Sequence, residues 1–298
     1  MKKYLLLFLI FIFTILNLLA QTDTAKVKVP SPWKLTGSTS LNFVQSSFTN
    51  WSSGGDNSVA GTAFGKLGLV YKKDKINWES TLDLAYGLTF VGSDRRKNDD
   101  KIDFASKFGY KAFKYWDYSG LVTFKSQFDK GYAKYPVEDK AKYNSKFFAP
   151  AYLTLSIGMD YKPNNNFSLL ISPLSAKLTF VNDDYLSEQG AFGVDKGERL
   201  LAAYGALIRS TYSKKFNDVI TTSSKLELFS NLLDSPEKVA INWEGKVILT
   251  VTKFIKANLD MQLMYDDKVK YYAADKSLES GAKVQFKQVL GIGFSFAF

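Results

Sequence analysis

The sequence contains no cysteine and no histidine. Without cysteine the chain can form no disulfide, no thiolate metal site and no lipid-modified cysteine anchor. Without histidine it lacks the usual general base, which excludes Ser-His-Asp hydrolysis and histidine-ligated zinc. We therefore expect no enzyme activity, and we assign no catalytic residue, no cofactor and no metal site.

A long hydrophobic run occurs only at the N-terminus. Met1, Lys2 and Lys3 precede an apolar stretch that continues to Leu19, and Ala20 offers a small residue for cleavage. The stretch is shorter than the ~20 apolar residues of a spanning helix. This pattern predicts a secretory signal peptide, with a retained anchor helix as the alternative. We expect a signal peptide at 1–20, a short periplasmic segment at 21–34 and one further domain at 35–298.

Beyond the signal segment, apolar and polar residues alternate along most of the chain. In residues 76–90, for example, Trp78, Leu82 and Leu84 share one face while Glu79 and Asp83 share the other. A period of two predicts strands with two chemically different faces. We expect twelve such strands, at residues 35–45, 59–71, 76–90, 101–112, 118–128, 151–161, 167–180, 200–212, 220–230, 241–251, 257–265 and 283–298. At Ser172-Pro173 the apolar set changes parity, which predicts a bulge or a break.

The connections between these segments alternate between short and long. Residues 72–75, 113–117 and 162–166 are short, whereas residues 91–100, 129–150 and 181–199 are long. Bacterial outer-membrane barrels have short periplasmic turns and long external loops. The sequence therefore predicts an all-β fold, a transmembrane antiparallel up-and-down β-barrel of about 12 strands (about 10–14), in a Gram-negative outer membrane.

In such a barrel the apolar face meets lipid and the polar face lines the interior. The residues expected to line the lumen are Glu79, Asp83, Lys101, Asp103, Lys107, Lys125, Asp160, Lys177, Arg209, Lys225, Glu227, Glu244, Lys246, Asp260, Lys283 and Lys287. Acids and bases are nearly balanced. This balance favours cross-strand ion pairs over a selectivity ring of one charge, with a weakly anion-preferring pathway as the alternative.

Aromatic residues gather near the predicted strand ends, as in the interfacial girdles of membrane barrels. They are Tyr71, Trp78, Tyr118, Tyr161, Tyr212, Trp243, Tyr265 and Phe298. The formal net charge is +10, but acids are interleaved with the bases in the loops. Such interleaving is unlike a nucleic-acid-binding patch, so we expect no nucleic-acid partner.

One loop motif, residues 45–58, combines a tryptophan with paired glycines. It includes Asn50, Trp51, Gly54, Gly55 and Asn57, which suit either a structured turn at the barrel mouth or a sugar-stacking loop. Together with residues 78–87 and 96–103, it resembles an uncharacterised Bacteroidota family, a domain of unknown function grouped with outer-membrane barrels. The resemblance runs from about Trp33 to the C-terminus. The terminal Phe298 resembles the signal by which the barrel-insertion machinery recognises its substrates.

Three functions remain open at the level of sequence. We expect a narrow pore for small solutes or a structural component of the outer membrane. The alternative is an assembly, partner-binding or glycan-binding barrel that acts through its long loops without transport. The expected partners are outer-membrane lipid, the barrel-insertion machinery and another envelope protein or a glycan.

Overall fold

The computed structural model describes residues 31–47, 56–132, 137, 139, 142–272 and 279–298. The predicted signal peptide and four of the five motif residues (Asn50, Trp51, Gly54 and Gly55) lie outside this part. Asn57 lies within it, where its carbonyl accepts a hydrogen bond from the Gly92 amide (3.2 Å). In the described part, no helix is long and apolar enough to cross a membrane.

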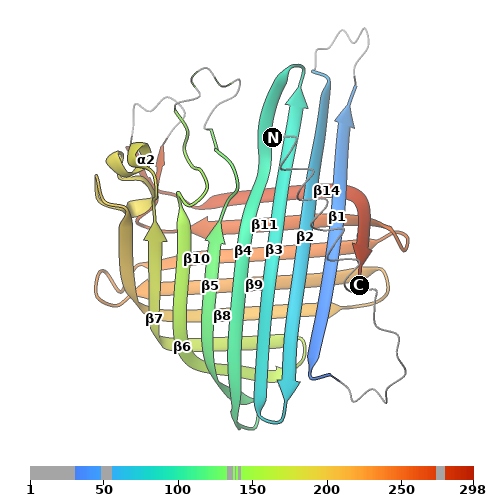
Figure 1. Ribbon diagram of the computed structural model, residues 1–298, viewed down its shortest axis with the longest axis vertical. Coiled ribbons are helices and arrows are strands. Elements are labelled where there is room, and N and C mark those ends of the chain that lie inside the picture. The colour runs from blue at the N-terminus through green and yellow to red at the C-terminus, as the bar shows by residue number, and fades with distance from the viewer. Residues whose placement is uncertain (1–30, 48–55, 133–136, 138, 140–141, 273–278) are drawn as a thin grey trace. The chain divides into compact units, whose positions relative to one another are not determined.

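Twelve antiparallel strands close into a barrel, in the ring order β1-β14-β11-β10-β9-β8-β7-β6-β5-β4-β3-β2 (Figure 1). Sequence neighbours pair with each other, so the predicted up-and-down topology and strand number are confirmed. The strands are β1 (Trp33–Ser46), β2 (Ser58–Lys73), β3 (Ile76–Val91), β4 (Asp94–Phe113), β5 (Trp116–Ser126), β6 (Ala151–Asn164), β7 (Phe167–Phe180), β8 (Leu200–Lys215), β9 (Ile220–Asn231), β10 (Val239–Thr250), β11 (Ile255–Tyr265) and β14 (Gln285–Ala297).

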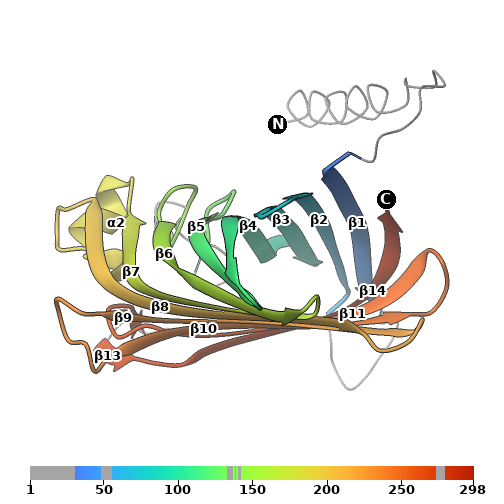
Figure 2. The ribbon, with the colours of Figure 1, turned by 90° about the horizontal axis from the view of Figure 1, so that it is seen from below.

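The barrel has a front wall of β1–β7 and a back wall of β8–β11 and β14. The strands of the two walls cross steeply in Figure 1, and Figure 2 shows the walls joining at β7–β8 and at β1–β14. A closed barrel requires tilted strands, so strands on opposite sides of the ring cross one another. Closure also leaves no unpaired strand edge in the ring.

The connections differ in length at the two ends of the barrel, largely as predicted. At one end the turns are residues 74–75, 114–115, 165–166, 216–219 and 251–254, which we call the short-turn end. The opposite, loop end carries residues 47–57, 127–150, 181–199, 232–238 and 266–284. The loops there include α2 (Asp184–Glu188), the 3-10 helix η1 (Ala191–Gly193) and a two-stranded sheet of β12 (Lys270–Tyr272) and β13 (Glu279–Ala282).

One predicted loop is wrong. Residues 91–100 form a two-residue turn at Gly92-Ser93 followed by the first seven residues of β4, which pair with β3. Charge made this segment look like a loop, but backbone pairing does not depend on side-chain polarity. The Asp100 carboxylate also accepts hydrogen bonds from the Phe128 amide (2.7 Å) and the Asp129 amide (2.9 Å), which tie β4 to the next loop.

The outward face is apolar over most of the barrel. Ile157 is 65% exposed, Leu174 68% and Phe294 64%. So many exposed apolar side chains on one continuous surface exceed what a soluble monomer presents to water. At the short-turn end Trp33 packs against Tyr71 (ring centroids 4.8 Å apart) and Trp78 (6.1 Å), which forms part of an outward aromatic belt.

Candidate functional site in the barrel interior

The polar positions of the strands point into the barrel, and the ring order proves it for several of them. Lys101 on β4 and Glu244 on β10 form an ion pair with Nζ and Oε2 2.8 Å apart. β4 and β10 stand on opposite sides of the ring. Two side chains from opposite sides of a closed barrel can meet only by crossing its interior. This pair therefore spans the lumen.

Further ion pairs cross at the same level. Lys125 Nζ on β5 lies 2.9 Å from Glu227 on β9 and 3.5 Å from Glu244. Lys225 Nζ on β9 lies 2.9 Å from both Asp103 on β4 and Glu244. Front-wall lysines thus bind back-wall acids, and a back-wall lysine binds a front-wall acid.

Arg209 completes this group, with its guanidinium 3.0 Å from Glu227 on the neighbouring strand. The group, which we call the central network, consists of Lys101, Asp103, Lys125, Arg209, Lys225, Glu227 and Glu244. Four cations face three carboxylates. Each carboxylate has at least two cationic partners, which is the arrangement that offsets the cost of removing charge from water. The network holds the two walls together across the lumen.

A second set of interior charges lies toward the short-turn end. Asp160 on β6 is fully buried and pairs with Lys107 (2.6 Å) and Lys162 (3.3 Å). It also accepts a hydrogen bond from the Ser168 hydroxyl (2.6 Å). Lys162 reaches Glu79 on β3 at 3.4 Å, which again joins strands that are not neighbours.

The other predicted lumen residues also form ion pairs, with one exception. Lys66 pairs with Asp83 (3.5 Å) and Lys246 with Asp260 (3.0 Å) between neighbouring strands. Lys177 on β7 instead pairs with Asp266 after β11 (2.7 Å), and Lys287 on β14 with Asp99 on β4 (2.5 Å), so these two pairs join the front wall to the back wall. Lys283 is different, because it lies between β13 and β14 and not on a barrel strand. The alternation that suggested a strand from residue 283 begins only at Gln285.

The interior also contains an apolar cluster on the same inward face. Leu121, Leu170, Leu207 and Phe229 are buried against one another, at 2%, 1%, 4% and 7% exposure. Leu207 and Phe229 each stand two positions from a central-network residue, Arg209 and Glu227, and therefore point the same way. The sequence did not predict this cluster, because each of four strands contributes only one of its residues. One apolar residue on the polar face does not disturb the alternation of a strand.

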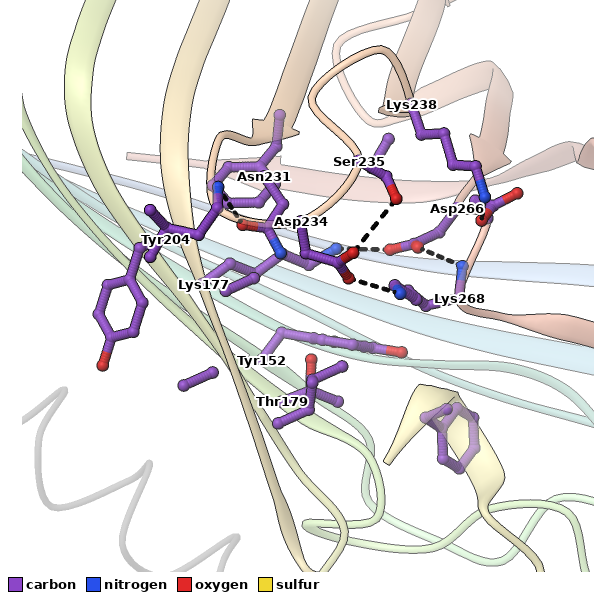
Figure 3. A pocket seen from close by; sticks show the side chains of 18 residues that line it. Tyr152, Lys177, Thr179, Tyr204, Asn231, Asp234, Ser235, Lys238, Asp266 and Lys268 are labelled. Carbon is purple, nitrogen blue, oxygen red and sulfur yellow. Dashed lines mark hydrogen bonds and ion pairs between the residues drawn. The ribbon is translucent and has the colours of Figure 1, made fainter. Parts of the chain in front are cut away.

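Two cavities flank the central network and share no lining residue. The larger, about 1000 Å³, belongs to the short-turn end, where residues of the turns such as Tyr115 and Asn165 line it. The smaller, about 220 Å³, belongs to the loop end, and its lining includes Tyr152, Lys177 and Asp266 (Figure 3). Lys101, Arg209, Lys225 and Glu244 of the central network line the larger cavity, and Phe229 of the apolar cluster lines the smaller. The ion pairs between opposite walls therefore narrow the lumen near its middle.

Two long loops pack together at the loop end around Asp183. This carboxylate is 7% exposed, pairs with Lys146, and accepts hydrogen bonds from the Tyr143 hydroxyl (2.7 Å) and from the Leu186 amide (2.9 Å) at the start of α2. Burial would raise the pKa of Asp183, but these partners outweigh burial and lower the pKa. Burial and the same hydrogen bond raise the pKa of Tyr143 to about 12.

Beneath that carboxylate the loops have a small core of their own. Ala149, Val181, Leu186 and Val194 are buried together, with Tyr143 and Phe192 packed against them. The described residues of the loop 127–150 and residues 181–199 therefore pack as one unit at the barrel mouth, which we call the loop cap. Their shared core holds the described parts of the two loops together.

Residues 43–132 match the sequence model of a family described as a protein of unknown function (DUF3078). The predicted resemblance to an uncharacterised family is thus confirmed. The match covers the end of β1 and all of β2–β5. It is shorter than the predicted resemblance, which runs from about Trp33 to the C-terminus. The origin of this protein in Bacteroidota stays a prediction. No curated protein sequence matches this chain.

Several solved structures match this chain at low identity. An outer-membrane channel from Pseudomonas putida F1 is 12% identical, with a TM-score of 0.41, over 93% of this chain and 100% of that one. The translocator domain of the autotransporter NalP from Neisseria meningitidis is 10% identical, with a TM-score of 0.36, over 95% and 92%. OmpT, an outer-membrane protein of Vibrio cholerae, is 9% identical, with a TM-score of 0.32, over 92% and 100%.

These matches assign no chemistry to this chain. In the described part, no group of three or more Asp or Glu side chains could hold a metal ion. Asp99 and Lys162, which pair with Lys287 and Asp160, were not among the residues predicted for the lumen. Asp99 and Lys162 fall in the predicted connections 91–100 and 162–166. Only the alternation of the strands, continued into these connections, could have predicted that the two side chains point inward.

Proposed function

We propose that this protein is an outer-membrane β-barrel of a Gram-negative bacterium whose lumen is closed by the central network. On this proposal it serves as a structural or ligand-binding barrel and not as a general-diffusion pore. The single observation that carries the proposal is the set of ion pairs between opposite walls, such as Lys101–Glu244 and Lys125–Glu227. An open aqueous pore needs its charges along the wall, whereas these charges meet across the middle.

The proposed location rests on the surface and the interior together. An apolar outward face with an aromatic belt suits hydrocarbon flanked by lipid headgroups, and the charged face is enclosed. The N-terminal segment would direct export, and outer-membrane lipid and the barrel-insertion machinery would be its partners. The loop cap would then face the exterior, where it is available to another envelope protein or a glycan.

A narrow gated channel is the second candidate. The cavity of about 1000 Å³ at the short-turn end favours it, because a purely structural barrel has no need of so large a polar space. In this alternative the central network is the gate, and solute passes only when its ion pairs separate. The two candidates differ in whether the protein conducts ions in its resting state.

Electrical recording in a planar lipid bilayer tests the closed lumen. We expect wild-type protein to show no stable unitary conductance. The variant Lys101→Ala/Lys125→Ala/Glu227→Ala/Glu244→Ala should conduct, since it removes three of the four cross-wall ion pairs of the central network, leaving only Lys225–Asp103, without changing net charge. The control Lys66→Ala/Asp83→Ala removes a pair between neighbouring strands and should stay silent.

Circular dichroism first establishes that each variant keeps its strand content. A stable open-pore conductance of the wild type would overturn the proposal. Rare openings between long closed periods would instead support the gated channel. Silence of the quadruple variant would show that these three ion pairs are not what closes the lumen.

A further inference from the structure

The smaller cavity at the loop end has an uneven distribution of charge. Its lining residues on barrel strands are Tyr152, Lys177, Thr179, Leu201, Ala202, Ala203, Tyr204, Phe229, Asn231 and Ala240. Of these described strand residues, Lys177 alone is charged. The carboxylates that line the cavity, Asp234, Asp266 and Asp267, all belong to loops. The strand wall of the pocket is therefore mostly aromatic and apolar, with two neutral polar residues, Thr179 and Asn231, and one cation.

Lys177 sits among the aromatic rings of this wall. Its Nζ lies 5.8 Å from the centre of the Tyr152 ring and 5.9 Å from that of Phe229. Figure 3 shows the Tyr152 ring beneath the row formed by Lys177, Asp266 and Lys268. A cation beside aromatic faces is a suitable partner for a flat molecule that carries an anionic group.

The carboxylate that now pairs with Lys177 belongs to a short loop segment. Asp266, Asp267 and Lys268, which we call the strap, directly follow β11. Asp266 pairs with Lys177 at 2.7 Å. The other two strap residues pair with residues of the loop between β9 and β10, Asp267 with Lys238 (2.8 Å) and Lys268 with Asp234 (2.7 Å).

Only one of the three strap pairs is shielded from water. The side chains of Lys238, Asp234 and Lys268 are 48%, 55% and 47% exposed, and exposed ion pairs contribute little stability. The Lys177–Asp266 pair, with side chains 23% and 26% exposed, is therefore the main ion pair that a ligand has to replace for the strap to lift. When it lifts, Lys177 loses its carboxylate and faces the pocket unpaired, which makes a ligand carboxylate a favourable replacement for Asp266.

We propose that this pocket binds a small organic anion with a flat apolar ring, and that the Asp266 carboxylate occupies the anion position when no ligand is bound. The ring lies against Tyr152 and Phe229, and the anionic group pairs with Lys177. The volume fits this class, because a cavity of about 150 Å³ accommodates benzene and the pocket measures about 220 Å³. The proposal does not depend on whether the lumen conducts.

Isothermal titration of the detergent-solubilised full chain with benzoate tests the site, with benzamide as the neutral molecule of the same shape. We expect saturable benzoate binding and at least about tenfold weaker benzamide binding. Lys177→Gln should weaken benzoate binding by about tenfold or more. Asp266→Asn should strengthen benzoate binding, because it removes the internal competitor.

Lys246→Gln is the matched control, since it removes an interior lysine that lines the other cavity and should leave benzoate binding unchanged. Circular dichroism checks that each variant is folded. The proposal is overturned if neither wild type nor Asp266→Asn binds benzoate saturably, if Lys177→Gln binds it as tightly as wild type, or if benzamide binds equally well. Conductance is measured separately, so an open pore would not affect these results.

Discussion

Individual polar residues on the apolar outward face of the barrel are satisfied by polar neighbours. Ser80 is the one break in the apolar side of β3, and it stands directly opposite Ser106 on β4. The two hydroxyls are 2.9 Å apart, and the Trp78 indole N–H donates to Ser106 at 2.8 Å. In hydrocarbon an unpaired hydroxyl is costly, so these residues form a closed polar cluster under the indole.

A single glycine permits the irregularity of β7. The pairing of β6 with β7 shifts register between Ile157 and Met159, next to Ser172-Pro173. A Cβ added to Gly158 would lie 2.1 Å from the Ile171 carbonyl oxygen. The Ser172 hydroxyl donates a hydrogen bond to the Ile157 carbonyl oxygen at 2.7 Å, which gives this backbone acceptor a partner at the bulge. The parity change in the sequence predicted this bulge, but only the structure identifies the glycine it needs.

Gly158→Ala should therefore destabilise the barrel by about 2 kcal/mol, because backbone and not a flexible side chain opposes the new methyl group. Urea unfolding of the purified protein in detergent, followed by tryptophan fluorescence, measures the change. Gly120→Ala is the control, since nothing lies within 4 Å of its Cβ position. Equal stability of the two variants would contradict the steric account.

At the scale of elements, the loop cap depends on one carboxylate. Asp183 is the N-cap of α2 and also binds residues of the preceding long loop. One of these is Tyr143, which is 40 residues away in sequence, so Asp183 joins the two loops. Its native partners, most of all Lys146, stabilise the charged form and lower its pKa below the ordinary 3.8. A group whose pKa falls on folding stabilises the folded form above its unfolded pKa and loses that contribution as the pH drops through the folded value.

The cap should consequently loosen on acidification below about pH 4 and remain closed at neutral pH. Hydrogen exchange of the α2 amides at about pH 6 and about pH 3, corrected for intrinsic rates, measures this. Protection should fall at the lower pH. Asp183→Asn should show reduced protection at both pH values and little further change between them. A pH response in the variant as large as that in wild type would contradict the role of Asp183.

At the scale of the whole molecule, the barrel closes where its first strand meets its last. Gly37 and Phe298 exchange two backbone hydrogen bonds of 2.9 Å. The Phe298 ring also covers Gly37 so closely that a Cβ there would lie 2.2 Å from its Cζ. The terminal aromatic thus packs over the seam, in addition to the recognition role that its position in the sequence predicts.

Phe298→Ala should lower the stability of the closed barrel by about 1 kcal/mol through this lost packing. Refolding of the purified chain into lipid vesicles, followed by urea unfolding, tests this in the absence of any insertion machinery. Phe286→Ala is the control, because that outward side chain is similarly exposed (57%, against 51% for Phe298) but lies at the other end of β14. Stability equal to the control would contradict a packing role for Phe298.

The central network and the loop-end pocket are also properties of the whole molecule, since each needs several elements at once. Glu244 shows why sequence reasoning stopped short of them. Its inward direction follows from alternation within β10, but its partners Lys101, Lys125 and Lys225 are on β4, β5 and β9. Near balance of charge predicted ion pairs, and no local pattern could say which walls they would join.

The sequence by itself determined the class of fold and the direction of most side chains. Strand alternation and the parity of connection lengths are local properties, and they were enough to predict twelve strands, the loop end and the short-turn end. Only the tertiary structure decided which opposite strands the ion pairs join across the lumen, that β4 extends through its charged segment, and that an apolar cluster lies inside. These features depend on the tilt and ring order that bring distant strands together, and such distances are not encoded in any one segment.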